Sequence, residues 1–136
     1  MNAPDRFLLP DVQGSADQRQ LAIHKVGVKG LRYPLALLDA DGSVQHTVSQ
    51  VTMSVGLPPE VKGTHMSRFV EILEQRRAPL TADRLLRMFE DMLLRLDASS
   101  GEIELAFPYF ISKAAPVSAV ESLLDYDVRM IVARRA

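Results

Sequence analysis

The chain has 136 residues, 47% of them hydrophobic, and a formal net charge of -1. It can bury one ordinary core, and a chain so near neutrality has no bulk attraction to nucleic acid or to an anionic membrane. It contains no cysteine, which excludes disulfides, thiolate metal ligands and a cysteine nucleophile. Neither a signal peptide nor a membrane-spanning stretch is apparent, so we expect a cytoplasmic location.

The first third of the chain predicts an arm followed by a hairpin. Residues 1–20 mix prolines, a glycine and polar residues, which indicates an extended N-terminal arm. Residues 21–38 are rich in Val, Leu, Ile and Tyr and predict a strand that is bent or bulged near Gly27 and Gly30. Residues 39–42, DADG, have the composition of a tight turn.

A partner strand is predicted over residues 43–55. Val44 and Val48 share one parity, whereas the apolar residues that follow share the other, namely Val51, Met53 and Val55. A change of phase within a strand indicates a bulge, which we expect near Ser49 or Gln50.

Two amphipathic helices are predicted next. The first covers residues 61–77, with Thr64 as a candidate N-cap and an apolar face formed by Met66, Phe69, Val70 and Leu73. The second follows Pro79 and is capped by Thr81. Its apolar face consists of Leu85, Met88, Phe89, Met92, Leu93 and Leu96.

Two further strands complete the pattern. Apolar residues alternate with polar ones over residues 102–112 and again over 124–132, and Pro108 indicates an edge or a bulge. The order ββααββ predicts one module over residues 21–136, an α+β fold in which two helices cover one face of a four-stranded antiparallel sheet. Ile131 and Ala133 make the second face partly apolar, so we expect homo-oligomers that join through the sheet edges.

A polar cluster is predicted where the first helix begins. It combines cations, hydroxyl groups, an imidazole and free backbone N–H groups, and its members are Lys62, Thr64, His65, Ser67 and Arg68. Such a set suits an anion. The alternative is an ordinary helix cap with solvated charges, in which Arg68 pairs with Glu71 or lies along the turn of Ile72.

Other chemistry-bearing residues form no recognisable motif. His24 and His46 each lie in a predicted strand, where a half-buried structural histidine is expected, and no metal-binding spacing is present. Two pairs of acids fall on alternate strand positions and indicate a solvated face: Glu102 with Glu104, and Asp125 with Asp127.

Four strings carry a family resemblance: LPDVQ (residues 9–13), HKVGVKGLRYP (24–34), HTVSQVTMSVGLP (46–58) and KGTHMSRF (62–69). On these strings the chain resembles the amino-terminal half of the prokaryotic type IB GTP cyclohydrolases, from about residue 9 to its last residues. The resemblance implies the tunnelling fold, in which such ββααββ units occur twice per subunit and their sheets join edge to edge into barrels.

The same resemblance implies a reaction. The family opens the imidazole ring of GTP, releases formate and forms 7,8-dihydroneopterin triphosphate for folate synthesis, using a divalent metal of the Zn or Mn type. The family's metal ligands and catalytic residues follow the matched region, so the resemblance places them beyond Ala136, the last residue of the sequence. We therefore expect no catalytic residue and no metal ligand in this chain, which would be an inactive amino-terminal piece that contributes the cluster at residues 62–68 to the triphosphate site.

Two alternatives remain open. A nitrile reductase of the same superfamily would need a nicotinamide cofactor and a nucleophilic cysteine, and this sequence has neither signature. A non-catalytic assembly module would need only the sheet edges.

Overall fold

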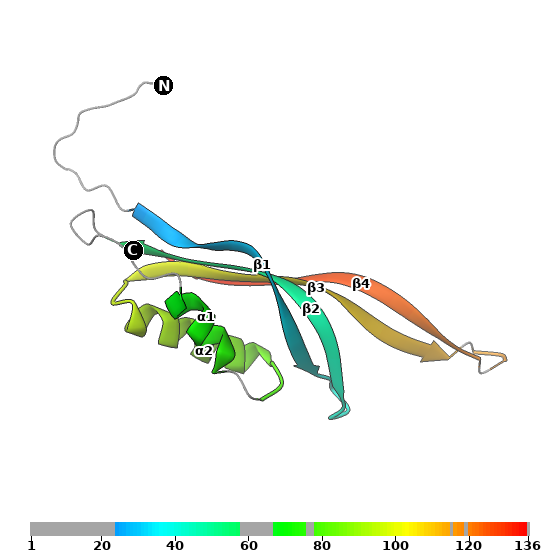
Figure 1. The fold of residues 1–136 in the computed structure, drawn as a ribbon. Coiled ribbons are helices and arrows are strands. Elements are labelled where there is room, and N and C mark those ends of the chain that lie inside the picture. Colours follow the sequence, from blue (N-terminus) through cyan, green and yellow to red (C-terminus); the bar gives the residue numbers. More distant parts are fainter. Residues whose placement is uncertain (1–23, 58–66, 76–77, 115, 119, 136) are drawn as a thin grey trace, which may run out of the picture.

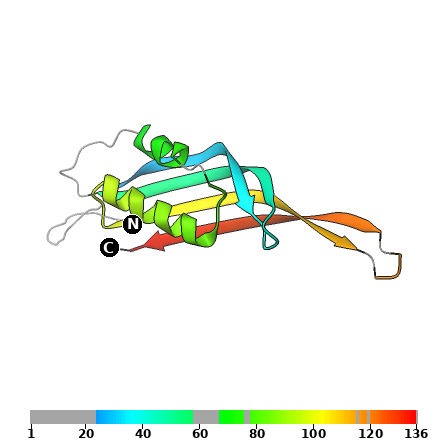
Figure 2. The same cartoon turned by 90° about the horizontal axis from the view of Figure 1, so that it is seen from below.

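The computed structural model describes residues 24–57, 67–75, 78–114, 116–118 and 120–135, so the predicted N-terminal arm and the last residue, Ala136, lie outside the described residues. Its elements are β1 (His24–Leu38), β2 (Val44–Leu57), α1 (Ser67–Glu74), α2 (Ala82–Arg95), β3 (Ser100–Ala114) and β4 (Glu121–Arg134). The strands form one antiparallel sheet in the order β1-β2-β3-β4, and both helices lie on one face of it (Figures 1 and 2). This is the predicted α+β arrangement. None of the described helices is long and apolar enough to cross a membrane.

The second predicted helix is confirmed in detail. The side chain of Thr81 accepts a hydrogen bond from the backbone N–H of Arg84 at 3.1 Å, which satisfies one of the free donors at the start of α2. The predicted apolar face is buried along its whole length and packs on the sheet: Leu85, Met88, Phe89, Met92, Leu93 and Leu96. Burial of this face provides most of the stabilisation of the helix layer.

The first helix differs from the prediction at its apolar face. Val70 was expected in the core but is 36% exposed, whereas Ile72 is buried together with Phe69 and Leu73. Phe69, Ile72 and Leu73 are spaced i, i+3 and i+4 and lie on one side of the helix, and this side packs on the sheet. The predicted cap Thr64 and the predicted core residue Met66 lie outside the described residues.

The predicted irregularity near the glycines of β1 is confirmed. The β1–β2 register shifts between Val28 and Leu31, and Gly30 has a φ of 67°. Glycine adopts this left-handed conformation without steric cost, and the backbone N–H of Gly30 donates to Oγ1 of Thr52 at 3.2 Å. The extra residue lies in β1, so the side chains that pack on the core change from even positions, Val26 and Val28, to odd positions, Leu31 and Tyr33.

The bulge predicted in β2 near Ser49 or Gln50 is wrong. The β1–β2 register runs without a shift from Val51 to Val44, and the β2–β3 register is regular up to its end at Gln50. Val44 and Val48 lie on the face opposite the helices and are exposed, and the core-facing positions in this part of the strand are the polar residues Gln45, Thr47 and Ser49. The apparent change of phase therefore came from polar residues on the inner face, not from a change in backbone geometry.

These inner polar residues connect β2 to β3 where the backbone ladder ends. The β2–β3 ladder stops at the pair of Gln50 and Ala106. Beyond it, Oγ1 of Thr47 donates to the carbonyl of Pro108 at 3.0 Å, and the Gln45 side chain donates to the carbonyl of Phe110 at 3.0 Å and accepts from its N–H at 2.8 Å. Pro108 lies just past the ladder, so its missing N–H costs no β2–β3 hydrogen bond. Pro108 therefore has no β2 partner in the ladder, which confirms the predicted edge position with respect to β2.

The β1–β2 turn is closed by backbone and side-chain hydrogen bonds. The N–H of Asp39 donates to the carbonyl of Ser43 at 2.8 Å, and Gly42 has a φ of 90°. The side-chain hydroxyl and backbone N–H of Ser43 donate to the Asp41 carboxylate at 2.6 Å and 2.9 Å, which lowers the pKa of Asp41. The turn is thus held more firmly when Asp41 is ionised.

We expect the Asp41 turn to weaken in acid. Because the folded-state pKa of Asp41 is lowered, its contribution to stability is present above the unfolded pKa, about 3.9, and is lost as the pH falls through the folded value. Urea unfolding between about pH 7 and about pH 3 should therefore show a smaller loss of stability for Asp41→Asn than for the parent. Equal losses for both proteins would contradict this assignment.

Candidate functional site

The predicted anion site is only partly within the described residues. Ser67 and Arg68 form the first turn of α1, and both side chains are exposed. Lys62, Thr64 and His65 lie outside the described residues. The structure therefore places two of the five predicted residues at a helix start, where unpaired backbone N–H groups favour an anion.

The side chain of Arg68 is exposed, and no ion pair joins it to another described residue. The ion pairs among the described residues join Arg87 to Asp83, Arg95 to Asp91, Arg129 to Glu104 and Arg134 to Glu90. Within the part of the chain that the structure describes, no ion pair joins Arg68 to Glu71, which was the alternative interpretation. An exposed arginine that none of these carboxylates holds can grip two oxygens of a phosphate.

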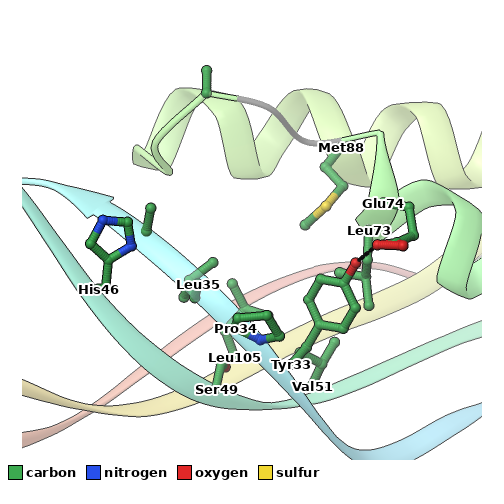
Figure 3. Close-up of a pocket in the computed structure, with 12 residues that line it drawn as sticks. Tyr33, Pro34, Leu35, His46, Ser49, Val51, Leu73, Glu74, Met88 and Leu105 are labelled. Atoms are coloured by element: carbon green, nitrogen blue, oxygen red, sulfur yellow. Dashed lines mark hydrogen bonds between the residues drawn. The ribbon is translucent and has the colours of Figure 1, made fainter.

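A cavity of about 280 Å³ opens between the sheet and the helices, near the other end of α1. Its walls are mainly apolar and include Leu35, Val51, Leu73, Met88 and Leu105. Figure 3 shows the phenol of Tyr33 pointing toward Glu74, and its hydroxyl donates a hydrogen bond to that carboxylate. The volume lies just below the range for ligand pockets, about 300 to 1,000 Å³, so the cavity fits a small group better than a whole nucleotide.

Ser49 supplies a polar atom to the cavity wall. It is 0% exposed, and its hydroxyl lies 3.3 Å from the carbonyl oxygens of Gln50 and Ala106. Buried hydroxyl groups need such partners. The hydrogen bonds of the Ser49 hydroxyl within β2 and to β3 therefore explain its burial without a ligand.

Arg68 and the cavity lie toward opposite ends of α1. Arg68 is in the first turn of α1, whereas Leu73 and Glu74 end it, and a helix of this length measures about 12 Å. Sequence reasoning missed the Tyr33–Glu74 contact because it joins residues 41 positions apart. Only the inward parity of Tyr33 in the first strand could have suggested a partner on the helix layer.

The remaining candidates whose side chains are described have the places that their parity gives them. The acidic pairs 102/104 and 125/127 lie on the face opposite the helices, where Arg129 pairs with Glu104 at 3.3 Å. The imidazole of His46 is exposed at one end of the cavity, not half-buried as expected, since its parity turns it away from the core (Figure 3). The side chain of His24 is outside the described residues.

A metal centre is not formed by the described residues. No group of three or more His, Cys, Asp or Glu side chains lies close enough in that part of the chain to hold an ion. The divalent metal implied by the resemblance therefore does not fit the residues that the structure describes, and no chemical step can be assigned to it here. The catalytic residues are expected beyond Ala136, at positions that this sequence does not contain. This expectation therefore stays a prediction.

The fold and these sites define a class of protein: an antiparallel α+β module with an exposed cation at a helix start, and no complete catalytic centre among its described residues. Residues 9–136 match the family described as "Type I GTP cyclohydrolase folE2". The chain belongs to this GTP cyclohydrolase family.

Curated relatives agree with the family match. The chain is 71% identical over 136 residues to "GTP cyclohydrolase FolE2 1" of Dechloromonas aromatica (strain RCB), a match that covers 100% of this chain and 51% of the relative. It is 54% identical over 129 residues to "GTP cyclohydrolase FolE2 2" of Cupriavidus metallidurans, covering 95% and 48%. It is 51% identical over 128 residues to "GTP cyclohydrolase FolE2" of Azoarcus sp. (strain BH72), covering 94% and 48%. The chain thus spans about half the length of these relatives.

Proposed function

We propose that this chain is the amino-terminal module of a cytoplasmic GTP cyclohydrolase of the prokaryotic type IB, which converts GTP to 7,8-dihydroneopterin triphosphate and formate in folate synthesis. The observation that carries the proposal is the family match over residues 9–136. A chimera tests it: this chain replaces the matched segment of the Dechloromonas aromatica relative, and the product is assayed with GTP.

The contribution of this module to the reaction is binding of the triphosphate. Lys62, Thr64, His65, Ser67 and Arg68 form the site, with the exposed guanidinium of Arg68 at the first turn of α1 as its main contact. A triphosphate concentrates several negative charges in a small volume, so cations and N–H donors at a helix start are suited to bind it. Arginine adds two parallel hydrogen bonds that fix the orientation of a phosphate.

Hydrolysis requires residues beyond Ala136. A divalent metal of the Zn or Mn type, held outside these 136 residues, would supply hydroxide near neutral pH. The sequence contains no cysteine, and the described residues form no metal-binding group.

The isolated chain is expected to release no formate from GTP, with Zn²⁺ or Mn²⁺ added, because it has no thiol and its histidines are not spaced as metal ligands. Formate should stay at the level of a heat-denatured control. Release well above that control would show that the chain carries a catalytic centre of its own.

Assembly through the sheet edges completes the proposal. The outer edge of β1 is partly occupied, since Leu80 bonds to the carbonyl of Ala36 at 2.7 Å and to the N–H of Leu38 at 3.2 Å. The rest of β1 and the outer side of β4 bear no other strand among the described residues. Unpaired strand edges promote pairing with a second chain.

We therefore expect the chain to self-associate, and sedimentation equilibrium at micromolar concentrations measures it. A species larger than the monomer, growing with concentration, is the expected result. A clean monomer at high micromolar concentration would contradict assembly through the edges.

A further inference from the structure

A two-stranded ribbon projects beyond the rest of the fold. We name it the distal ribbon; it consists of residues 109–114 of β3 and 121–126 of β4, paired from Tyr109 with Tyr126 to Ala114 with Glu121. The β2–β3 ladder has already ended at Ala106, and Figure 2 shows the ribbon extending past both helices. A two-stranded ribbon alone is marginally stable in water, so this one needs another layer.

The helix-side face of the distal ribbon is apolar and uncovered. Tyr109 packs against the core, and strand alternation places on the same face the side chains of Ile111, Lys113, Ser122, Leu124 and Tyr126. Ile111, Leu124 and Tyr126 are 39%, 41% and 43% exposed. This face continues the core surface of the sheet without the helices that cover it elsewhere.

Opposite charges stand at the two ends of this face. Of its six side chains only Lys113 is charged, and it lies near the tip. At the base, the hydroxyl of Tyr109 donates to the carboxylate of Asp39, and Asp41 lies in the same turn. The hydrogen bond to Asp39 and burial raise the pKa of Tyr109, so the phenol stays neutral.

We propose that the distal ribbon is an interface with a second copy of this chain, in which two ribbons stack face to face with their tips in opposite directions. The two-fold axis passes between the two ribbons, across their strands, at the level of Ile111 and Leu124. It places each Ile111 over Ile111 of the second copy. The same axis brings Lys113 over Tyr109 of the second copy and beside the turn that carries its Asp39 and Asp41. The apolar middle of each ribbon is then covered, and the opposite charges at its ends are paired. A self-complementary interface requires both.

The base of the ribbon also has room for the opposite tip. A hollow of about 270 Å³ lies beside Leu80, Phe107, Tyr109 and Val128. The axis that pairs the two Ile111 residues brings Val120, which is 64% exposed, over Val128 of the second copy. This contact uses a sheet face, so it is distinct from pairing through strand edges and goes beyond the proposed function.

Site-specific cross-linking of the whole 136-residue chain tests the interface, because the natural sequence has no cysteine. Stacked sheets lie about 10 Å apart, farther than the Cα separation of a disulfide, about 5.5 to 6 Å, so a short bis-maleimide is the suitable reagent. Ile111→Cys should give a covalent dimer at least about fivefold more efficiently than Phe110→Cys, whose side chain lies on the opposite face of the same ribbon.

Charge reversal gives a second measurement on the same protein. In the Ile111→Cys background, Lys113→Glu should reduce the dimer yield severalfold, and adding Asp41→Lys should restore it, with circular dichroism confirming that each variant is folded. Equal cross-linking at positions 111 and 110 would overturn the proposal and leave the edges as the contact. Loss of yield in Lys113→Glu without rescue would also count against the stated orientation.

Discussion

Phe69→Ala is expected to lower the free energy of unfolding by about 3 to 5 kcal/mol, which is a large part of the total stability of a domain of this size, about 5 to 15 kcal/mol. Phe69 is 0% exposed and packs α1 on the sheet together with Ile72 and Leu73. Removing its ring leaves a cavity that a helix of only 8 residues cannot close without shifting. Urea unfolding of the 136-residue chain measures the change.

Val70→Ala is the matched control for Phe69. The two residues are adjacent on α1, but Val70 is 36% exposed, so its truncation should change stability by no more than about 0.5 kcal/mol. Similar losses for the two variants would mean that the buried face of α1 is not the one described.

Arg68→Ala in the chimera with the Dechloromonas aromatica relative should raise the Michaelis constant for GTP about tenfold, which corresponds to about 1.4 kcal/mol of lost binding if that constant follows affinity. The guanidinium is exposed at the first turn of α1 and is not paired with Glu71, so its loss removes a ligand contact and little stability. Arg68→Lys should also weaken binding, because lysine keeps the charge but cannot form two parallel hydrogen bonds.

Arg87→Ala provides a control in the same assay. Arg87 is an exposed arginine of α2 that pairs with Asp83 at 2.7 Å, one turn earlier on the helix. Its loss removes an exposed ion pair, worth about 0.3 to 0.5 kcal/mol, and should leave the Michaelis constant unchanged. If Arg68→Ala behaves like Arg87→Ala, Arg68 is an ordinary surface residue.

The sequence predicted the sheet and helices because their hydrophobic patterns are regular. The apolar face of α2 shows the i, i+3, i+4 spacing of a helix, and Thr81 marked where this helix begins. The glycines of β1 indicated the bulge in that strand. The error in β2 had a physical cause. Gln45, Thr47 and Ser49 face inward and bond to the β3 backbone, so hydrophobicity was a poor guide to orientation there.

The candidate site was less predictable than the fold. Ser67 and Arg68 are at the helix start that the pattern indicated, whereas contacts between Tyr33 and Glu74 and between Tyr109 and Asp39 join distant residues. Periodicity assigns a face to each side chain but does not identify its partner across the core. The free face of the distal ribbon became visible only when the extents of the two ladders were compared.

If this chain acts as a module of a GTP cyclohydrolase, the chimera with the Dechloromonas aromatica relative should turn over GTP. Its Dechloromonas aromatica part keeps about half of a relative that is 71% identical to this chain over the replaced segment. Formate and dihydroneopterin triphosphate released from GTP would be measured against the unaltered relative and a heat-denatured sample. We predict release of both products at a rate within about tenfold of the unaltered relative, a barrier difference below about 1.4 kcal/mol. A folded chimera that binds GTP but releases neither product above the denatured control would contradict the assignment.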